Sequence, residues 1–174
     1  DYKNNSDKNI KDSSFSWVVN KSKILESDDC SLMGERYKTS TRNTSEKWDM
    51  VELGTISDIQ KGTSITKKDV SQGNIPVIAG GQKPAYYHDT SNRTGKTITV
   101  SASGAYAGFV NYFDIPIFAS DCTTIQSKNE DLVMSDFLFY LLKGKQDDIY
   151  KFQQGGAQPH VYSKDLAKIK IPLL

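Results

Sequence analysis

The stretch KTITVSASGAYAGFVNYF, residues 96–113, constrains the fold more than any other part of this chain. Its first half alternates between two kinds of side chain: Ile98, Val100 and Ala102 are apolar, whereas Thr97, Thr99, Ser101 and Ser103 carry hydroxyl groups. A period of two residues is typical of a β-strand, whose side chains point alternately to opposite faces. The chain can turn at Gly104, and a second arm with Phe109, Tyr112 and Phe113 follows. The pattern predicts a β-hairpin.

Segments on both sides of this hairpin also favour short strands. NIPVIAGG, residues 74–81, is a brief apolar run that ends at paired glycines, and IPIFASDCTTIQS, residues 115–127, indicates one further strand. WDMVELGTISDIQKG, residues 48–62, could bury its aliphatic side chains as a short strand or helical turn: Val51, Leu53, Ile56 and Ile59. Near the N-terminus, the apolar patch at Trp17, Val18 and Val19 is strand-like.

One segment is strongly helical. In SDFLFYLLKGKQDDIYKF, residues 135–152, Ser135 or Asp136 can cap a helix that Gly144 breaks or kinks. Its apolar stripe consists of Phe137, Leu138, Leu141 and Leu142. SKDLAKIKIPLL, residues 163–174, predicts a short capped helical turn that leads into a strand. Together these segments predict an α+β fold with a curved mixed β-sheet and a few helices.

At 174 residues, the chain is long enough for one domain with a hydrophobic core and an extension, and too short for two ordinary domains. Residues 1–14 are almost without apolar side chains, which predicts a loop or tail. We expect residues 1–47 to form an extension or linker and residues 48–174 to form the compact domain. No apolar run approaches the roughly 18 to 20 residues of a membrane helix. Because nothing marks secretion either, we expect a cytoplasmic protein without membrane contact.

Familiar catalytic and metal-binding motifs are missing from the sequence. Cys30 and Cys122 lie far apart without further Cys or His at metal-ligand spacing, so we favour free thiols over a disulfide. There is no phosphate-binding GxxxxGK[ST] loop, no GxSxG nucleophile elbow and no Asn-Pro-Pro-aromatic run of the kind adenine methyltransferases use. His88 and His160 are not paired with a nucleophile in the sequence, and we interpret them as loop or surface histidines. We therefore predict a protein that is not an enzyme and needs no metal or cofactor.

The stretch QQGGAQPHVY, residues 153–162, is too polar for a core strand and too broken for a helix. A glutamine amide offers a donor and an acceptor in one plane, which complements the major-groove edge of adenine. Gly155 and Gly156 would let the backbone turn sharply, and Pro159 would keep the exit extended. Two interpretations are open: a loop that presents amides to bases, or an ordinary solvent loop.

The net charge is only +1, but the cations are unevenly distributed. Between residues 61 and 96 the cations are Lys61, Lys67, Lys68, Lys83, Arg93 and Lys96, against the acids Asp69 and Asp89. This excess suits a phosphate-rich partner, and a solvated charged face explains it equally well. Within this region GGQKPAYYHDTSNRTGK, residues 80–96, has no clear element, and irregular segments of this length are usually functional or disordered.

The hairpin itself could also approach a nucleic acid. One face of its first arm carries hydroxyl groups, and its tip holds glycine, alanine and one tyrosine, Tyr106, so a phosphate backbone or groove could come close without steric conflict. A tight hairpin facing the interior of a barrel would select the same small residues.

Three phrases carry a resemblance to a known family: WDMVELGTISDIQKG, then GNIPVIAGG with ITVSASGAYAGFV, then FQQGGAQPHVYSKDLAKIKIPL. In this order and spacing they resemble the target-recognition domain of type I restriction-modification specificity subunits, over residues 48–174. A weaker similarity lies in ESDDCSLMGERYK, residues 26–38, which looks like the end of an adenine-specific DNA methyltransferase chain, with Met33 where a small polar residue is more usual. The two together would describe a fused methyltransferase and specificity polypeptide.

The resemblance implies that the chain reads one short half-site of double-stranded DNA in the major groove. It implies as partners an adenine-specific DNA methyltransferase domain or subunit and a restriction nuclease subunit. The glutamine-rich loop corresponds to a constant framework motif, so variable readout is expected from residues 82–96 and from the hairpin. The candidate DNA-binding residues are Lys67, Lys68, Gln82, Lys83, Tyr86, Tyr87, His88, Asn92, Arg93, Lys96, Ser101, Ser103, Tyr106, Gln154 and Gln158.

Two other kinds of binding module stay open. An assembly module that docks a methyltransferase or another protein could use the aromatic pairs Tyr86–Tyr87 and Tyr112–Phe113. A carbohydrate- or peptide-binding β module would use the same aromatic residues, but it leaves the cation cluster unexplained.

Overall fold

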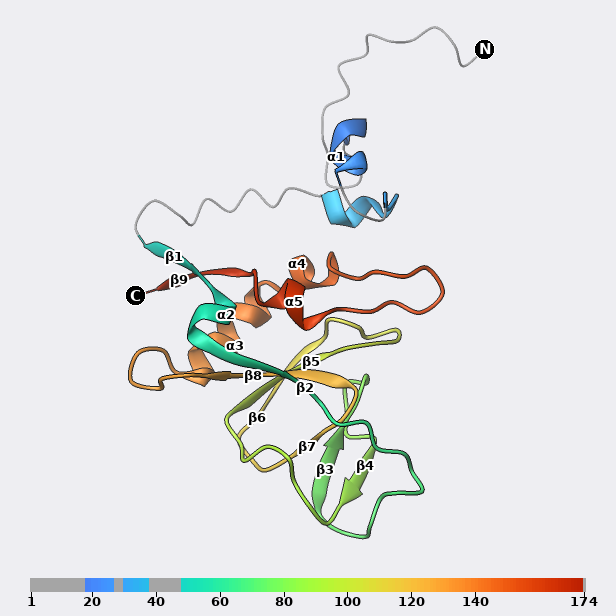
Figure 1. The fold of residues 1–174 in the computed structure, drawn as a ribbon, viewed down its shortest axis with the longest axis vertical. Coiled ribbons are helices and arrows are strands. Elements are labelled where there is room, and N and C mark those ends of the chain that lie inside the picture. The colour runs from blue at the N-terminus through green and yellow to red at the C-terminus, as the bar shows by residue number, and fades with distance from the viewer. Residues whose placement is uncertain (1–17, 27–29, 38–47, 174) are drawn as a thin grey trace, which may run out of the picture. The chain divides into compact units, whose positions relative to one another are not determined.

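The computed structural model describes residues 18–26, 30–37 and 48–173 (Figure 1). The chain divides into two compact units, residues 1–41 and residues 42–174. The predicted tail at residues 1–14 lies outside the described residues. None of the helices in the described ranges is long and apolar enough to cross a membrane.

The N-terminal unit contains a short helix, α1 (Lys21–Leu25), and a 3-10 turn, η1 (Gly34–Tyr37). The strand predicted around Val18 is wrong for the described residues: Val18 and Val19 belong to no strand, and Trp17 lies outside the description. The reason is the next residue, Asn20, whose side chain accepts a hydrogen bond from the Ser22 amide at 3.0 Å and so begins a helix.

The larger unit is built on a four-stranded antiparallel sheet in the order β2-β8-β5-β6. Its strands are β2 (Ser57–Lys61), β5 (Thr97–Ser101), β6 (Val110–Phe113) and β8 (Cys122–Ser127). The predicted hairpin is confirmed, since β5 pairs with β6 and Val100 lies opposite Val110. All five residues of β5 are buried, however, so the hydroxyl face of this arm is inside the protein. Ser101 is only 4% exposed.

Two helices complete the core of this sheet. The long helical prediction is confirmed as α3 (Ser135–Gly144) and α4 (Gln146–Tyr150), with the break beside Gly144. Leu138 and Leu142 are fully buried and pack with Ile98 and Ile125 of the sheet. The predicted cap is wrong: Ser135 lies inside the helix, and its amide and hydroxyl both donate to the Glu130 carboxylate, the hydroxyl at 2.5 Å. A carboxylate from the preceding loop therefore satisfies the start of the helix.

A second, three-stranded sheet has the order β4-β3-β7. It consists of β3 (Ile75–Ile78), β4 (Tyr86–His88) and β7 (Phe118–Ala119), and β3 runs parallel to β7. Two predictions are corrected here. Residues 80–96 are not wholly irregular, because β4 lies within them. Residues 115–127 form two strands rather than one, because the chain turns at Ser120, whose amide donates to the Ile78 carbonyl at 2.7 Å.

The chain ends of the larger unit pair with each other. β1 (Asp49–Glu52) and β9 (Lys170–Leu173) form a two-stranded antiparallel sheet, joined to the core by α2 (Leu53–Ile56) and α5 (Ser163–Leu166). The predicted helical turn and strand at the C-terminal end are confirmed, although the Tyr162 side chain at the helix start makes no cap hydrogen bond. With antiparallel sheets, one mixed sheet and few helices, the predicted α+β class is confirmed.

Candidate nucleic-acid interface

The hairpin tip and the glutamine-rich loop lie against each other. Ser103 pairs with His160 as an isolated β-bridge, and the Gly104 amide donates to the Pro159 carbonyl at 3.0 Å. Figure 1 shows the β5–β6 turn and the loop between α4 and α5 extending to the same side of the four-stranded sheet. Two segments that are about fifty residues apart in sequence therefore form one surface, which we call the tip surface, comprising residues 102–108 and 153–162.

The three glutamines of this loop have different environments. The Gln153 amide donates to the Ala107 carbonyl at 2.8 Å, which ties the loop to the hairpin. The Gln154 amide donates to the Asp165 carboxylate at 3.1 Å, and the Gln154 backbone pairs with His160. Gln158 is exposed, whereas Gln153 and Gln154 are half-buried. Of the three amides in this loop, Gln158 is thus the one that the surrounding protein leaves accessible.

The loop between β3 and β4 reaches the same tip. A Cβ added at Gly80 would lie 2.7 Å from the Ser103 carbonyl oxygen, so the close approach requires glycine. The Gln82 carbonyl accepts a long hydrogen bond from the Asn111 side chain at 3.5 Å. Gln82 and Lys83 are exposed beside the tip surface. In the sequence they belong to one irregular segment with residues 84–96, and β4 separates them from residues 89–96.

Arg93 is held within the protein. Its guanidinium donates to the Thr124 hydroxyl at 2.9 Å, to the Asn92 carbonyl at 2.7 Å and to the Lys61 carbonyl at 3.2 Å. Thr124 is buried, so this cation anchors the loop after β4 to the central sheet. In sequence, an anchoring arginine looks the same as a phosphate-binding one, and nothing near Arg93 distinguishes the two.

Asn92 is also engaged by the protein. Its amide nitrogen donates to the Ala119 carbonyl at 2.9 Å, and its oxygen accepts from the Ala119 amide at 2.7 Å. This pair of bonds continues the ladder of β7 with a side chain in place of a strand. The donor and the acceptor of the Asn92 side chain are thus bound to the protein backbone and do not face solvent.

The other candidates of this region fall into two groups. His88 is 8% exposed, its Nδ1 accepts from the Ser71 amide at 3.0 Å, and its ring meets Phe118 edge-on at 5.3 Å. Tyr86 and Tyr87 belong to the same strand and are exposed, Tyr87 at 58%. Because successive side chains along a strand point to opposite faces, Tyr87 points away from the face on which His88 packs.

The lysine candidates remain at the surface. Lys67 and Lys68 are exposed in a turn that Thr66 and Asp69 close with a 2.5 Å side-chain hydrogen bond. The hydrogen bonds from Thr66 lower the pKa of Asp69. Lys96 is exposed and approaches Glu130 at 3.9 Å. Lys67 and Lys68 are therefore available to phosphates, in contrast to Arg93.

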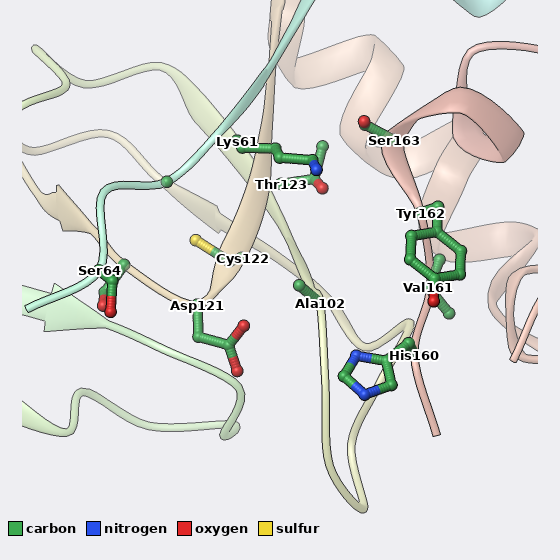
Figure 2. A pocket seen from close by; sticks show the side chains of 12 residues that line it. Lys61, Ser64, Ala102, Asp121, Cys122, Thr123, His160, Val161, Tyr162 and Ser163 are labelled. Atoms are coloured by element: carbon green, nitrogen blue, oxygen red, sulfur yellow. The ribbon is translucent and has the colours of Figure 1, made fainter. Parts of the chain in front are cut away.

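A cleft of about 300 Å³ opens beside the tip surface (Figure 2). One wall comes from the end of β2 and the β7–β8 turn, and the other from residues 160–163, with Ala102 between them. In Figure 2, Asp121 and His160 face one another from opposite sides, and Lys61 lies above them. At its base, burial raises the pKa of the Cys122 thiol to about 12. Neither Asp121 nor His160 was among the candidate DNA-binding residues predicted from the sequence.

The described ranges contain no group of three or more metal-ligating side chains. Unlike Tyr86 and Tyr87, the second aromatic pair considered for docking packs against the protein. Tyr112 stacks on Phe139 at 5.4 Å and donates to Asp136 at 2.5 Å, and Phe113 packs against a buried cluster. Burial, followed by the Asp136 carboxylate, raises the pKa of Tyr112. What the arrangement offers at its surface is a set of hydrogen-bonding groups and cations around a rigid tip.

Comparisons with known proteins agree on one family. The model of the type I restriction modification DNA specificity domain matches residues 45–173. A Mycoplasma pneumoniae protein named as a type I specificity subunit is 25% identical over 135 residues, which are 76% of this chain and 36% of that protein.

Solved structures share the fold. The S subunit of the type I restriction-modification system from M. genitalium has a TM-score of 0.66 at 23% identity, over 78% of this chain and 36% of that one. The HsdS subunit from Thermoanaerobacter tengcongensis has a TM-score of 0.55 at 18% identity, over 78% and 35% of the two chains. This chain therefore spans about a third of the length of these relatives.

Proposed function

The chain belongs to the family of type I restriction modification DNA specificity domains, and from this premise we propose that it recognises one short half-site of double-stranded DNA in the major groove. The observation that carries the proposal is the convergence of the hairpin tip, the glutamine-rich loop and the β3–β4 loop at one end of the sheet. A tip of small residues can enter a groove, and hydrogen-bonding groups around it can reach base edges.

Within this proposal, the exposed lysines bind phosphates and the tip reads bases. Lys67, Lys68 and Lys83 have the exposure and flexibility that phosphate contacts use. Tyr106 and Gln158 project from the two halves of the tip surface. Residues 48–174 form the recognition domain, and residues 1–47 form the extension that leads from a methyltransferase chain or domain.

The chemistry belongs to partners. We assign no catalytic step to this chain: an adenine-specific DNA methyltransferase subunit or domain would methylate the recognised site, and a restriction nuclease subunit would cut sites that lack the methyl group. The complex would act in the cytoplasm, where the DNA is.

A docking module is the second candidate, and the exposure of Tyr86 and Tyr87 favours it. Exposed aromatic pairs are typical anchors of protein interfaces. Salt separates the two functions, because phosphate contacts release counterions and an apolar interface does not.

The test is a selection from random duplex DNA with the whole chain at low salt, followed by binding measurements over a salt series. Enrichment of one short motif is expected. The double variant Lys67→Ala/Lys68→Ala should lower the slope of log affinity against log salt by about 2. Lys170→Ala, on β9 and away from the tip, serves as the matched control. Retention of DNA without any enriched motif, or no retention at all, would contradict base-specific recognition.

A further inference from the structure

Asp121 lies at the turn between β7 and β8, on a backbone that several segments hold in place. The Ser120 amide donates to the Ile78 carbonyl at 2.7 Å, and the Ala102 amide donates to the Asp121 carbonyl at 3.2 Å. On the other side, the Gly62 amide donates to the Cys122 carbonyl at 2.8 Å. The carboxylate is therefore mounted on a rigid turn beside the hairpin tip, as a precise contact requires.

The carboxylate itself is only partly used by the protein. Its Oδ2 accepts a hydrogen bond from the Ser103 hydroxyl. A Cβ at Gly80 would lie 3.1 Å from the same oxygen, so the β3–β4 loop also closes on this side. The other oxygen, Oδ1, makes no hydrogen bond or ion pair with any described residue. Asp121 is exposed, and Figure 2 shows its side chain in the cleft opposite His160.

A carboxylate at this place needs an explanation if the tip surface binds DNA. Phosphates repel it, and Lys61, which lines the same cleft, suits phosphates instead. An ionised carboxylate only accepts hydrogen bonds. In the major groove the donors are the amino groups of cytosine and adenine, and these are the groups with which it can pair favourably.

The two bases differ in what lies beside the amino group. Adenine presents its N7 acceptor next to N6, and two acceptors facing each other repel. Cytosine presents N4 and no acceptor of its own on that edge. Ser103 donates to one carboxylate oxygen, so the other oxygen is free to accept from a single donor, and cytosine offers such a donor without an acceptor beside it.

We propose that Asp121 is a specificity-determining residue that accepts a hydrogen bond from the N4 amino group of a cytosine in the half-site. This inference rests on the proposed function, because it assumes that the tip surface enters the major groove. The proposal assigns one base of the half-site to the Asp121 side chain. Asp121 lies outside residues 82–96 and outside the hairpin, the two segments from which base readout was expected.

The test compares selections from random duplex DNA by the wild-type chain, Asp121→Asn and Asp131→Asn. The Asp121→Asn side chain keeps the size of the original and its oxygen can still accept from Ser103, which leaves the amide nitrogen, a donor, in place of the free carboxylate oxygen. We expect one position to lose its preference for cytosine by roughly tenfold, in favour of bases that present an acceptor there. Asp131, exposed in the loop between β8 and α3, undergoes the same charge change without altering the motif. Thermal melting of each variant checks that the fold is kept.

A second measurement needs no variant. N4-methylcytosine at the assigned position, in which a methyl group replaces the major-groove hydrogen of N4, should weaken wild-type binding by about the same factor. An enriched motif that Asp121→Asn leaves unchanged, or full affinity for the methylated duplex, overturns the role of Asp121 while DNA recognition stands. A wild-type chain that enriches no motif overturns both proposals together.

Discussion

Replacing Arg93 by alanine should damage the fold more than the binding of DNA. The guanidinium makes three hydrogen bonds, to the Thr124 hydroxyl, the Asn92 carbonyl and the Lys61 carbonyl. The bond to buried Thr124 is charge-assisted and contributes about 1.5 to 3 kcal/mol. The two carbonyls are nearer to solvent and regain water when the side chain is removed, so they add only a few tenths of a kcal/mol each. The free energy of unfolding should therefore fall by about 2 to 3 kcal/mol.

This loss can be measured by thermal melting. For a folded unit of roughly 130 residues, an unfolding entropy of about 2.1 cal/mol/K per residue makes 1 kcal/mol worth about 4 °C. Arg93→Ala should thus lower Tm by about 8 to 12 °C. At a temperature where the variant is fully folded, its affinity for random duplex DNA should stay within about twofold of the wild type.

Lys83→Ala is the matched control, because it removes an exposed cation from the neighbouring loop. It should leave Tm unchanged and weaken DNA binding on all sequences. If instead Arg93→Ala melts with the wild type and loses DNA affinity as Lys83→Ala does, the guanidinium serves DNA and its role as an anchor is refuted.

Two further predictions concern the loop and the cleft. Gly155 has φ of +94°, and an added Cβ would lie 2.9 Å from a carbonyl oxygen. Gly155→Ala should therefore lower the free energy of unfolding by about 1 to 2 kcal/mol, measured by thermal melting. Gly156→Ala, with open space around the added methyl group, should change it little. An equal Tm for the two would remove the strain argument. Because the Cys122 pKa is raised to about 12, its thiol stays protonated at pH 8, and iodoacetamide should label exposed Cys30 alone until denaturant is added. Rapid labelling of both cysteines in the native protein would show that the cleft base is open.

The regular elements were predictable where local patterns decide them. The period of two residues in 97–101 and the apolar stripe of 135–142 led to β5 and α3, because strands and helices impose these spacings on any buried face. The break between β7 and β8 was not predictable. No glycine or proline marks Ser120 or Asp121, and the turn exists because Ile78 and Gly62, distant in sequence, bind its backbone.

The candidate site was predictable only in part, for a related reason. Lys83 and Arg93 have the same charge and lie ten residues apart, yet one is exposed and the other donates to three groups of the protein. The difference depends on whether the fold brings hydrogen-bond acceptors near the side chain. Two acceptors of Arg93 come from β8 and β2, which are distant in the sequence. Composition therefore identifies a cation-rich region without telling which of its cations are exposed.

The glutamine-rich loop illustrates how such a surface can vary without losing its shape. The bond from Gln153 to Ala107 holds the loop against the hairpin, and the bond from Gln154 to Asp165 ties the loop to α5. Gln158 stands outside these two side-chain bonds and is exposed, so its replacement alters what the loop presents and leaves both of them in place. A recognition surface needs both kinds of residue, since base contacts discriminate only when the backbone that carries them is fixed. The three glutamines of the loop thus have two roles: Gln153 and Gln154 fix the loop, and Gln158 is accessible to a binding partner.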